Sequence, residues 1–126
     1  MKLQAIAILT FLTFTNVMAQ NISKSTNMNT LELTQEWDKT FPQSDKVEHT
    51  KITFHNRYGI TLAADLYKPK NAQGRLAAVA VSGPYGAVKE QVSGRYAQTL
   101  AERGFLTIAF DPSYYGESGG TPRYLT

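Results

Sequence analysis

The spacing of apolar residues divides the chain into segments with different predicted structures. Apolar and polar residues alternate over Val47–Phe54 and again over Ile60–Tyr67, a period typical of half-buried strands. The intervening segment, Asn56–Gly59, has the composition of a turn, with a glycine where a positive φ is readily adopted. Pro69 and a polar run follow the second segment. The sequence therefore predicts an antiparallel hairpin.

Two uninterrupted apolar runs come next, Leu76–Val81 and Phe105–Phe110, and such runs suit strands covered on both faces in a parallel sheet. The segment between them predicts an amphipathic helix over Val88–Arg103, and Gly104 suits the left-handed residue that ends such a helix. The residues expected on its buried face are Val92, Tyr96 and Leu100, with Ala97 and Ala101 beside them. Strand, helix and strand form one βαβ unit, which is right-handed in ~98% of cases. Chemistry in such sheets gathers beyond the carboxyl ends of the strands.

The first 45 residues show the pattern of an export signal followed by a polar segment. Residues 1–19 have a basic start, a short apolar core and small residues at the end, as in a secretory signal peptide cleaved after Ala19. We therefore expect an exported protein, either periplasmic or secreted. Residues 20–45 are predicted to be a flexible N-terminus with a short helix from Thr30 to Lys39, and Trp37 and Phe41 are expected to pack onto the domain. Residues 46–126 are predicted to form that single domain.

Composition excludes several classes of partner and site. The formal charge is only +3 and the basic residues are scattered, so no nucleic-acid partner is expected, nor a membrane partner once the signal is removed. The chain has no cysteine, so a disulfide, a thiolate nucleophile or a cysteine-bound metal is impossible. The two histidines, His49 and His55, both fall on the predicted hairpin and are read as ordinary surface or turn residues. We expect no metal and no cofactor.

The order of these segments carries a resemblance to a known superfamily. A hairpin, a strand, Ser82–Gly86, a helix, a strand ending at Asp111 and then Tyr115–Gly120 resembles the N-terminal part of an α/β-hydrolase. Within that superfamily the chain is most similar to exported serine hydrolases of the dienelactone-hydrolase, cocaine-esterase and X-Pro-peptidase type. In those proteins a Pro-Tyr pair follows the third strand. The resemblance implies an α/β fold that is an incomplete α/β-hydrolase sheet: the hairpin followed by one right-handed βαβ unit.

The resemblance also implies a role for the loop after the Leu76–Val81 strand. In this family that loop supplies part of the oxyanion hole, which needs a donor ~3 Å from the oxygen that gains charge. Pro84 has no N–H, so the candidate donors are the backbone N–H groups of Tyr85 and Gly86 and the Tyr85 hydroxyl. The cocaine-esterase-like relatives use a tyrosine hydroxyl at the matching position, which favours Tyr85. The alternative interpretation is an aromatic lid over the strand end, with its hydroxyl in water.

Gly116-Glu-Ser-Gly-Gly120 matches the Gly-x-Ser-x-Gly pattern of a nucleophile elbow. An elbow needs a strand that runs directly into its first glycine, whereas here the strand ends five residues earlier, at Asp111. The sequence therefore favours a structural turn containing Gly116, Ser118 and Gly120, which Asp111 is expected to anchor by hydrogen bonds. Ser118 as a nucleophile is the disfavoured alternative.

The nucleophile, acid and histidine of an α/β-hydrolase all follow this turn in the chain. We therefore expect the chain to be inactive alone: the N-terminal fragment of a secreted serine hydrolase, or a degenerate remnant, whose complete form takes a small-molecule acyl substrate by ester or peptide hydrolysis. Leu76–Val81 would then be an exposed, uncharged sheet edge. The alternatives are a non-catalytic exported α/β module and a doubly wound nucleotide-binding domain, although Ser82–Gly86 lacks the Gly-x-Gly-x-x-Gly of a phosphate loop.

Overall fold

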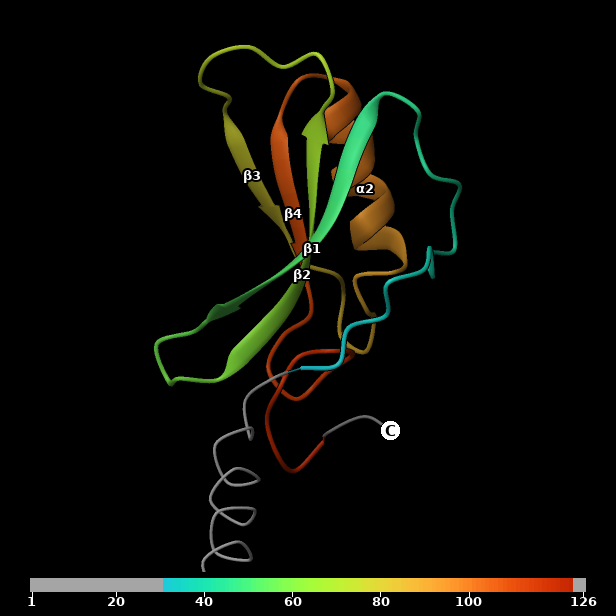
Figure 1. Cartoon of the computed structure of the whole chain (residues 1–126). Coiled ribbons are helices and arrows are strands. Elements are labelled where there is room, and N and C mark those ends of the chain that lie inside the picture. The colour runs from blue at the N-terminus through green and yellow to red at the C-terminus, as the bar shows by residue number, and fades with distance from the viewer. Residues whose placement is uncertain (1–30, 124–126) are drawn as a thin grey trace, which may run out of the picture. The chain divides into compact units, whose positions relative to one another are not determined.

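The computed structural model describes residues 31–123 of the chain. The signal peptide predicted over residues 1–19 lies outside the described residues. The described part contains β1 (Val47–His55), β2 (Thr61–Pro69), β3 (Ala78–Val81), α2 (Val92–Glu102) and β4 (Leu106–Phe110) (Figure 1). No helix within residues 31–123 is long and apolar enough to cross a membrane.

The strands form one sheet with the order β1-β2-β4-β3. β1 and β2 pair antiparallel, with Gly59 at a φ of 75° in the turn between them, so the predicted hairpin is confirmed. β2 also pairs antiparallel with β4, and β3 pairs parallel with β4. β2 lies between β1 and β4 and is buried along most of its length. The alternation of its residues predicted burial on one face only, which is wrong, because residues of both faces are buried. The mixed α/β architecture that we predicted is present.

β3 is the edge strand beside β4, as expected. It is shorter than the predicted Leu76–Val81 segment, and it is not covered on both faces: Ala78 and Ala80 are exposed, while Val79 and Val81 are half-buried. Figure 1 shows α2 on one side of the sheet, and within residues 31–123 no helix lies on the other. Among the described residues, the outer edge of β3 is therefore unpaired and no helix covers the second face.

Helix α2 differs from the prediction in its start and in its buried face. It begins at Val92, because residues 88–91 form a turn whose Gln91 N–H donates to the Val88 carbonyl at 3.1 Å. Val92 and Tyr96 are 57% and 60% exposed. The buried residues are small or polar: Ser93, Gly94, Ala97, Gln98 and Ala101.

Small residues are needed on this face because the helix lies very close to its neighbours. A Cβ at Gly94 would come within 2.2 Å of the Lys89 carbonyl oxygen and 3.1 Å of the Tyr67 hydroxyl. At the end of the helix Gly104 has a φ of 101°, and its N–H donates to the Ala101 carbonyl at 3.0 Å, as expected of its role in ending the helix.

The N-terminal segment, residues 31–46, contains no helix, so the helix predicted from Thr30 to Lys39 is wrong over the part that the structure describes. The segment is fixed instead by tertiary contacts. Trp37 donates its ring N–H to the Phe41 carbonyl at 2.8 Å, and the Thr40 N–H donates to the Glu90 carbonyl at 3.0 Å. Phe41 is buried in the core and Trp37 packs against it, as predicted.

Candidate active site

Two loops meet beyond the carboxyl ends of the parallel strands. The β3–α2 loop, Ser82–Gln91, follows β3, and the β4 turn, Asp111–Gly120, follows β4. The rings of Tyr85 and Tyr115 lie 6.0 Å apart, edge to face at 76°, and the Lys89 N–H donates to Asp111 Oδ1 at 2.7 Å. The structure therefore brings the two predicted loops together at one rim.

Tyr85 and Gly86 occupy the centre of a tight turn in the β3–α2 loop. The Ala87 N–H donates to the Pro84 carbonyl at 3.1 Å, and Gly86 has a φ of 81°, the conformation that a type II turn requires at its third residue. The Tyr85 side chain is 87% exposed. Within residues 31–123 neither the Tyr85 N–H nor the Gly86 N–H donates a hydrogen bond. Both groups are thus available to a ligand at the rim.

The Asp111 carboxylate, which is fully buried, ties the two loops together. Oδ2 accepts from the Lys89 ammonium and from the Glu117 N–H, each at 3.0 Å, while Oδ1 accepts from the Lys89 N–H. Gly116 lies against this carboxylate with a φ of 47°, and a Cβ there would come within 2.1 Å of Asp111 Oδ2. A side chain at position 116 would displace the carboxylate.

Ser118 is buried with both hydrogen-bonding functions of its hydroxyl in use. Its Oγ accepts from the Ala63 N–H at 2.8 Å and donates to the Asp111 carbonyl at 2.7 Å. Only 1% of the residue is exposed. This is the geometry of a turn fastened to β2, and it leaves the hydroxyl no access to a substrate. Gly120, with a φ of 112°, lies against the ring of Tyr114.

A cluster of charged residues connects the two rim loops to the N-terminal segment and β1. We call it the ion cluster, and it consists of Asp38, Lys51, Lys89, Glu90, Asp111 and Glu117. Lys89 and Asp111 are fully buried, Lys51, Glu90 and Glu117 are half-buried, and Asp38 is exposed. Glu117 Oε2 accepts from the ammonium groups of Lys51 and Lys89, both at 2.7 Å. Lys89 also pairs with Glu90. The cluster joins the N-terminal segment, β1 and both rim loops. The hydrophobic pattern of the sequence did not predict this cluster. Lysine is rarely fully buried unless it is paired, and the pattern does not show which residues pair in the folded chain.

The pairing in the ion cluster changes the pKa values of its members. Burial alone would raise the pKa of Glu117, but hydrogen bonds from Lys51 and Lys89 outweigh it and lower that pKa to about 2. Burial alone would lower the pKa of Lys89, but its bonds to Glu117 and Glu90 and the charge of Asp111 raise it. The Glu117 carboxylate and the Lys89 ammonium are therefore held in their charged forms at neutral pH.

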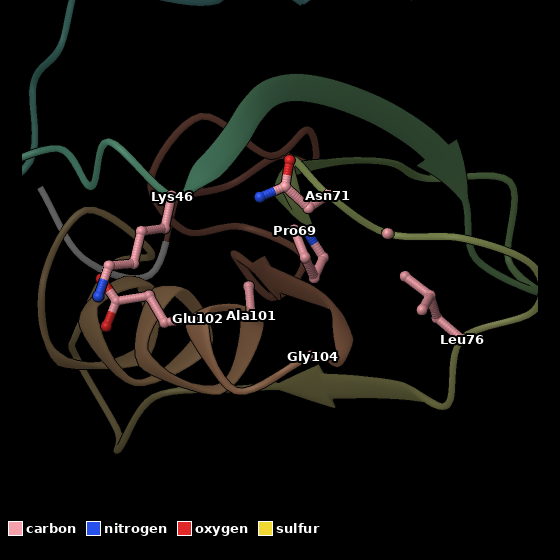
Figure 2. A pocket seen from close by; sticks show the side chains of 8 residues that line it. Lys46, Pro69, Asn71, Leu76, Ala101, Glu102 and Gly104 are labelled. Carbon is pink, nitrogen blue, oxygen red and sulfur yellow. The ribbon is translucent and has the colours of Figure 1, made fainter.

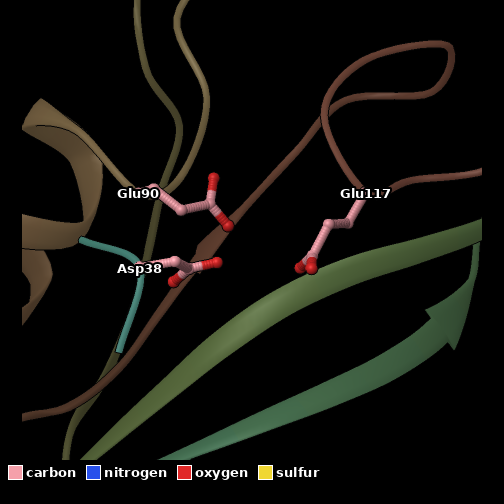
Figure 3. A group of neighbouring side chains, drawn as sticks. All are labelled: Asp38, Glu90 and Glu117. Atoms are coloured by element: carbon pink, nitrogen blue, oxygen red, sulfur yellow. The ribbon is translucent and has the colours of Figure 1, made fainter. Parts of the chain in front are cut away.

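Three carboxylates of this cluster, on Asp38, Glu90 and Glu117, have oxygens within 4.8 Å of one another, the arrangement of a candidate cation site (Figure 3). Lys51 and Lys89 place their ammonium groups among these carboxylates. The two ammonium groups therefore supply the positive charge that balances the three carboxylates, the role that a bound cation would otherwise have.

His49 is not the ordinary surface histidine that we predicted. Its Nε2 lies 2.8 Å from Asp65 Oδ1, and Asp65 is fully buried. The ring of His49 also packs edge to face against Trp37, with centroids 5.2 Å apart. His55 is exposed and lies 3.2 Å from the Thr61 hydroxyl. Among the described residues no serine hydroxyl bonds to either histidine, so residues 31–123 contain no serine–histidine pair.

A hollow lies at the other end of the strands, near the C-terminal end of α2 (Figure 2). Its volume is about 270 Å³. It is lined by residues at the ends of β2 and α2 and in the connections next to β1, β2, β3 and β4. These residues are Lys46, Pro69, Asn71, Ala72, Leu76, Ala101, Glu102 and Gly104. None of the predicted site residues lines it.

No protein-family model matches the chain. Two curated relatives match at high identity. The uncharacterized protein PA2218 of Pseudomonas aeruginosa is 75% identical over 99 residues, which are 78% of this chain and 26% of that protein. The uncharacterized protein YcjY of Escherichia coli is 47% identical over 81 residues, 61% of this chain and 26% of that protein. The chain thus spans about a quarter of the length of these relatives.

Solved structures support the architecture. The crystal structure of PA2218 superposes with a TM-score of 0.73 at 75% identity, covering 75% of this chain and 30% of that one. Acetyl xylan esterase 1 from Thermoanaerobacterium sp. superposes with a TM-score of 0.54 at 20% identity, covering 77% of this chain and 29% of the esterase. At that identity the likeness concerns the fold alone. The described residues have the fold of the N-terminal part of α/β-hydrolase enzymes.

Proposed function

We propose that this chain supplies the oxyanion-binding part of an exported serine hydrolase that cleaves carboxylic esters or peptides, and that it does not hydrolyse them by itself. The observation that carries the proposal is the turn at Tyr85 and Gly86. Its two backbone N–H groups have no partner within residues 31–123, and it lies where the parallel strands end. That is the location at which open α/β sheets bind their ligands.

In this proposal the carbonyl oxygen of an acyl substrate rests against the turn. When a nucleophile attacks the carbonyl carbon, negative charge develops on that oxygen, and donors fixed ~3 Å away stabilise it. The Tyr85 hydroxyl or the N–H of Tyr85 or Gly86 fills this role. The contact between Asp111 and the Lys89 N–H holds the loop in position, because it fixes the chain three residues after Gly86.

The nucleophile, acid and histidine are proposed to come from a segment that corresponds to the remaining three-quarters of the relatives. Ser118 cannot serve, because its hydroxyl is buried and bonded to Ala63 and Asp111. A non-catalytic exported module is the second candidate, and the lack of a serine–histidine pair within residues 31–123 favours it. The two candidates differ in whether the chain supports hydrolysis when it is joined to such a segment.

The test uses a fusion protein: the full chain followed by the part of PA2218 that lies beyond the matched region. We expect the fusion protein to hydrolyse p-nitrophenyl acetate and to be labelled by a fluorophosphonate, while the chain alone does neither. Tyr85→Phe should lower kcat by ~10²-fold if the hydroxyl is the donor. The control is Tyr58→Phe, since Tyr58 is 73% exposed in the β1–β2 turn.

The possible results separate the candidates. An unchanged kcat in Tyr85→Phe would assign the oxyanion to backbone N–H groups alone. A folded fusion protein that neither hydrolyses esters nor reacts with the fluorophosphonate would refute the serine-hydrolase proposal and favour the non-catalytic module.

A further inference from the structure

We infer that Tyr115 and Tyr85 form an aromatic wall beside the oxyanion donors, and that this wall selects substrates with an aromatic group next to the scissile carbonyl. The inference rests on the proposed function, and it names the substrate class of that site. The two tyrosines come from loops that follow different strands, and their rings meet edge to face at 6.0 Å. Aromatic rings prefer this arrangement, and a third ring can extend it.

The backbone of the β4 turn is arranged to present Tyr115. Tyr114 has a φ of 74°, which is a real outlier for a bulky residue. Two contacts hold it there: its N–H donates to the Gly119 carbonyl at 2.8 Å, and its ring lies against Gly120, where a Cβ would come within 2.5 Å of the ring. Strained residues of this kind persist where the surrounding structure imposes them, often at ligand sites.

The positive φ of Tyr114 is accompanied by different positions for the rings of Tyr114 and Tyr115, which are consecutive in the chain. The Tyr114 ring packs on Gly120 inside the turn, whereas the Tyr115 ring reaches the Tyr85 ring on the neighbouring loop. The Tyr115 N–H donates to the Pro112 carbonyl at 3.2 Å, which fixes its backbone. A turn that required only compactness would place a glycine at position 114, where a positive φ costs little.

The chemistry of the wall is apolar and aromatic because the charged residues of the same loops are engaged elsewhere. Lys89 pairs with Glu90 and with Glu117 in the ion cluster. Tyr85 presents 87% of its surface beside the unpaired N–H groups of its own turn. A large aromatic surface exposed next to polar donors is the usual composition of a small-molecule site.

The aromatic group of the substrate can belong to the acyl side or to the alcohol side of an ester. The experiment therefore compares three esters in the fusion protein: methyl acetate, methyl phenylacetate and benzyl acetate. We expect kcat/KM to be about tenfold higher for one of the two aromatic esters than for methyl acetate, and that ester identifies the side that contacts the wall.

Tyr115→Leu should lower the ratio of kcat/KM for that aromatic ester to kcat/KM for methyl acetate to about one, and Tyr115→Phe should retain the higher ratio. The matched control is Tyr96→Leu, because Tyr96 is an exposed tyrosine on α2. Equal kcat/KM for all three esters in the unaltered fusion protein would refute the inference, as would a preference that survives Tyr115→Leu. Either result leaves the proposed function intact, whereas a folded fusion protein that hydrolyses no ester, p-nitrophenyl acetate included, and does not react with the fluorophosphonate refutes the proposed function itself.

Discussion

Replacement of Ser118 by alanine tests whether the Gly-x-Ser-x-Gly segment is a structural turn. The substitution removes the hydrogen bond from the Ala63 N–H at 2.8 Å and the bond to the Asp111 carbonyl at 2.7 Å. Because the site is 1% exposed, water cannot replace the lost hydroxyl. A buried group left without a partner costs about 1–3 kcal/mol, so two such groups give an expected loss of roughly 2–6 kcal/mol.

The measurement is urea unfolding of the full chain, followed by the fluorescence of its single tryptophan and by circular dichroism. Trp37 packs edge to face on Phe41 at 5.6 Å, so its emission reports the loss of tertiary structure. The matched control is Ser82→Ala, which alters an exposed serine and should change the free energy of unfolding by less than about 0.5 kcal/mol. A loss in Ser118→Ala no larger than that of the control would refute the structural assignment.

Two other variants test the ion cluster. Lys89→Met should destabilise the full chain by about 3–5 kcal/mol, because it leaves the fully buried Asp111 carboxylate without its ammonium partner. Arg95→Met at an exposed site should have little effect; urea unfolding compares the two variants, and equal losses would contradict the buried pairing. Since the pKa of Glu117 is lowered from 4.5 to about 2, its ionisation contributes stability that is present above pH 4.5 and is lost as the pH falls towards 2. Glu117→Gln should therefore be roughly 3 kcal/mol less stable than the parent at pH 7, and the difference should vanish near pH 2. A constant difference for Glu117→Gln would show that its charge contributes nothing.

The backbone plan of the fold could be predicted because its signals are local. The hairpin follows from a period of two around Gly59, and the end of α2 follows from Gly104; both glycines have positive φ in the structure. The parallel pair and the exposed edge follow from two apolar runs joined by a helix. These features depend on neighbours within a few residues of the chain.

The buried side chains could not be predicted in the same way. The hydrophobic pattern placed Val92 and Tyr96 in the core, yet the helix packs through Gly94 and other small residues, since close approach to the Lys89 carbonyl leaves no room for larger ones. The repeat of small residues at Ser93, Gly94, Ala97 and Ala101 was visible and would have indicated this face. The burial of Lys89 was not visible, because its partners on the β4 turn lie more than twenty residues away in the chain.

The ion cluster also indicates where the protein tolerates added sequence. It ties together the N-terminal segment, β1 and both rim loops, so a peptide inserted into any of these must strain several ion pairs at once. The connection between β2 and β3 makes none of those pairs, and Gly74 within it has nothing within 4 Å of where a side chain would begin. An affinity tag or a fluorescent reporter placed at Gly74 would label the molecule at the end remote from Tyr85 and leave the rim undisturbed.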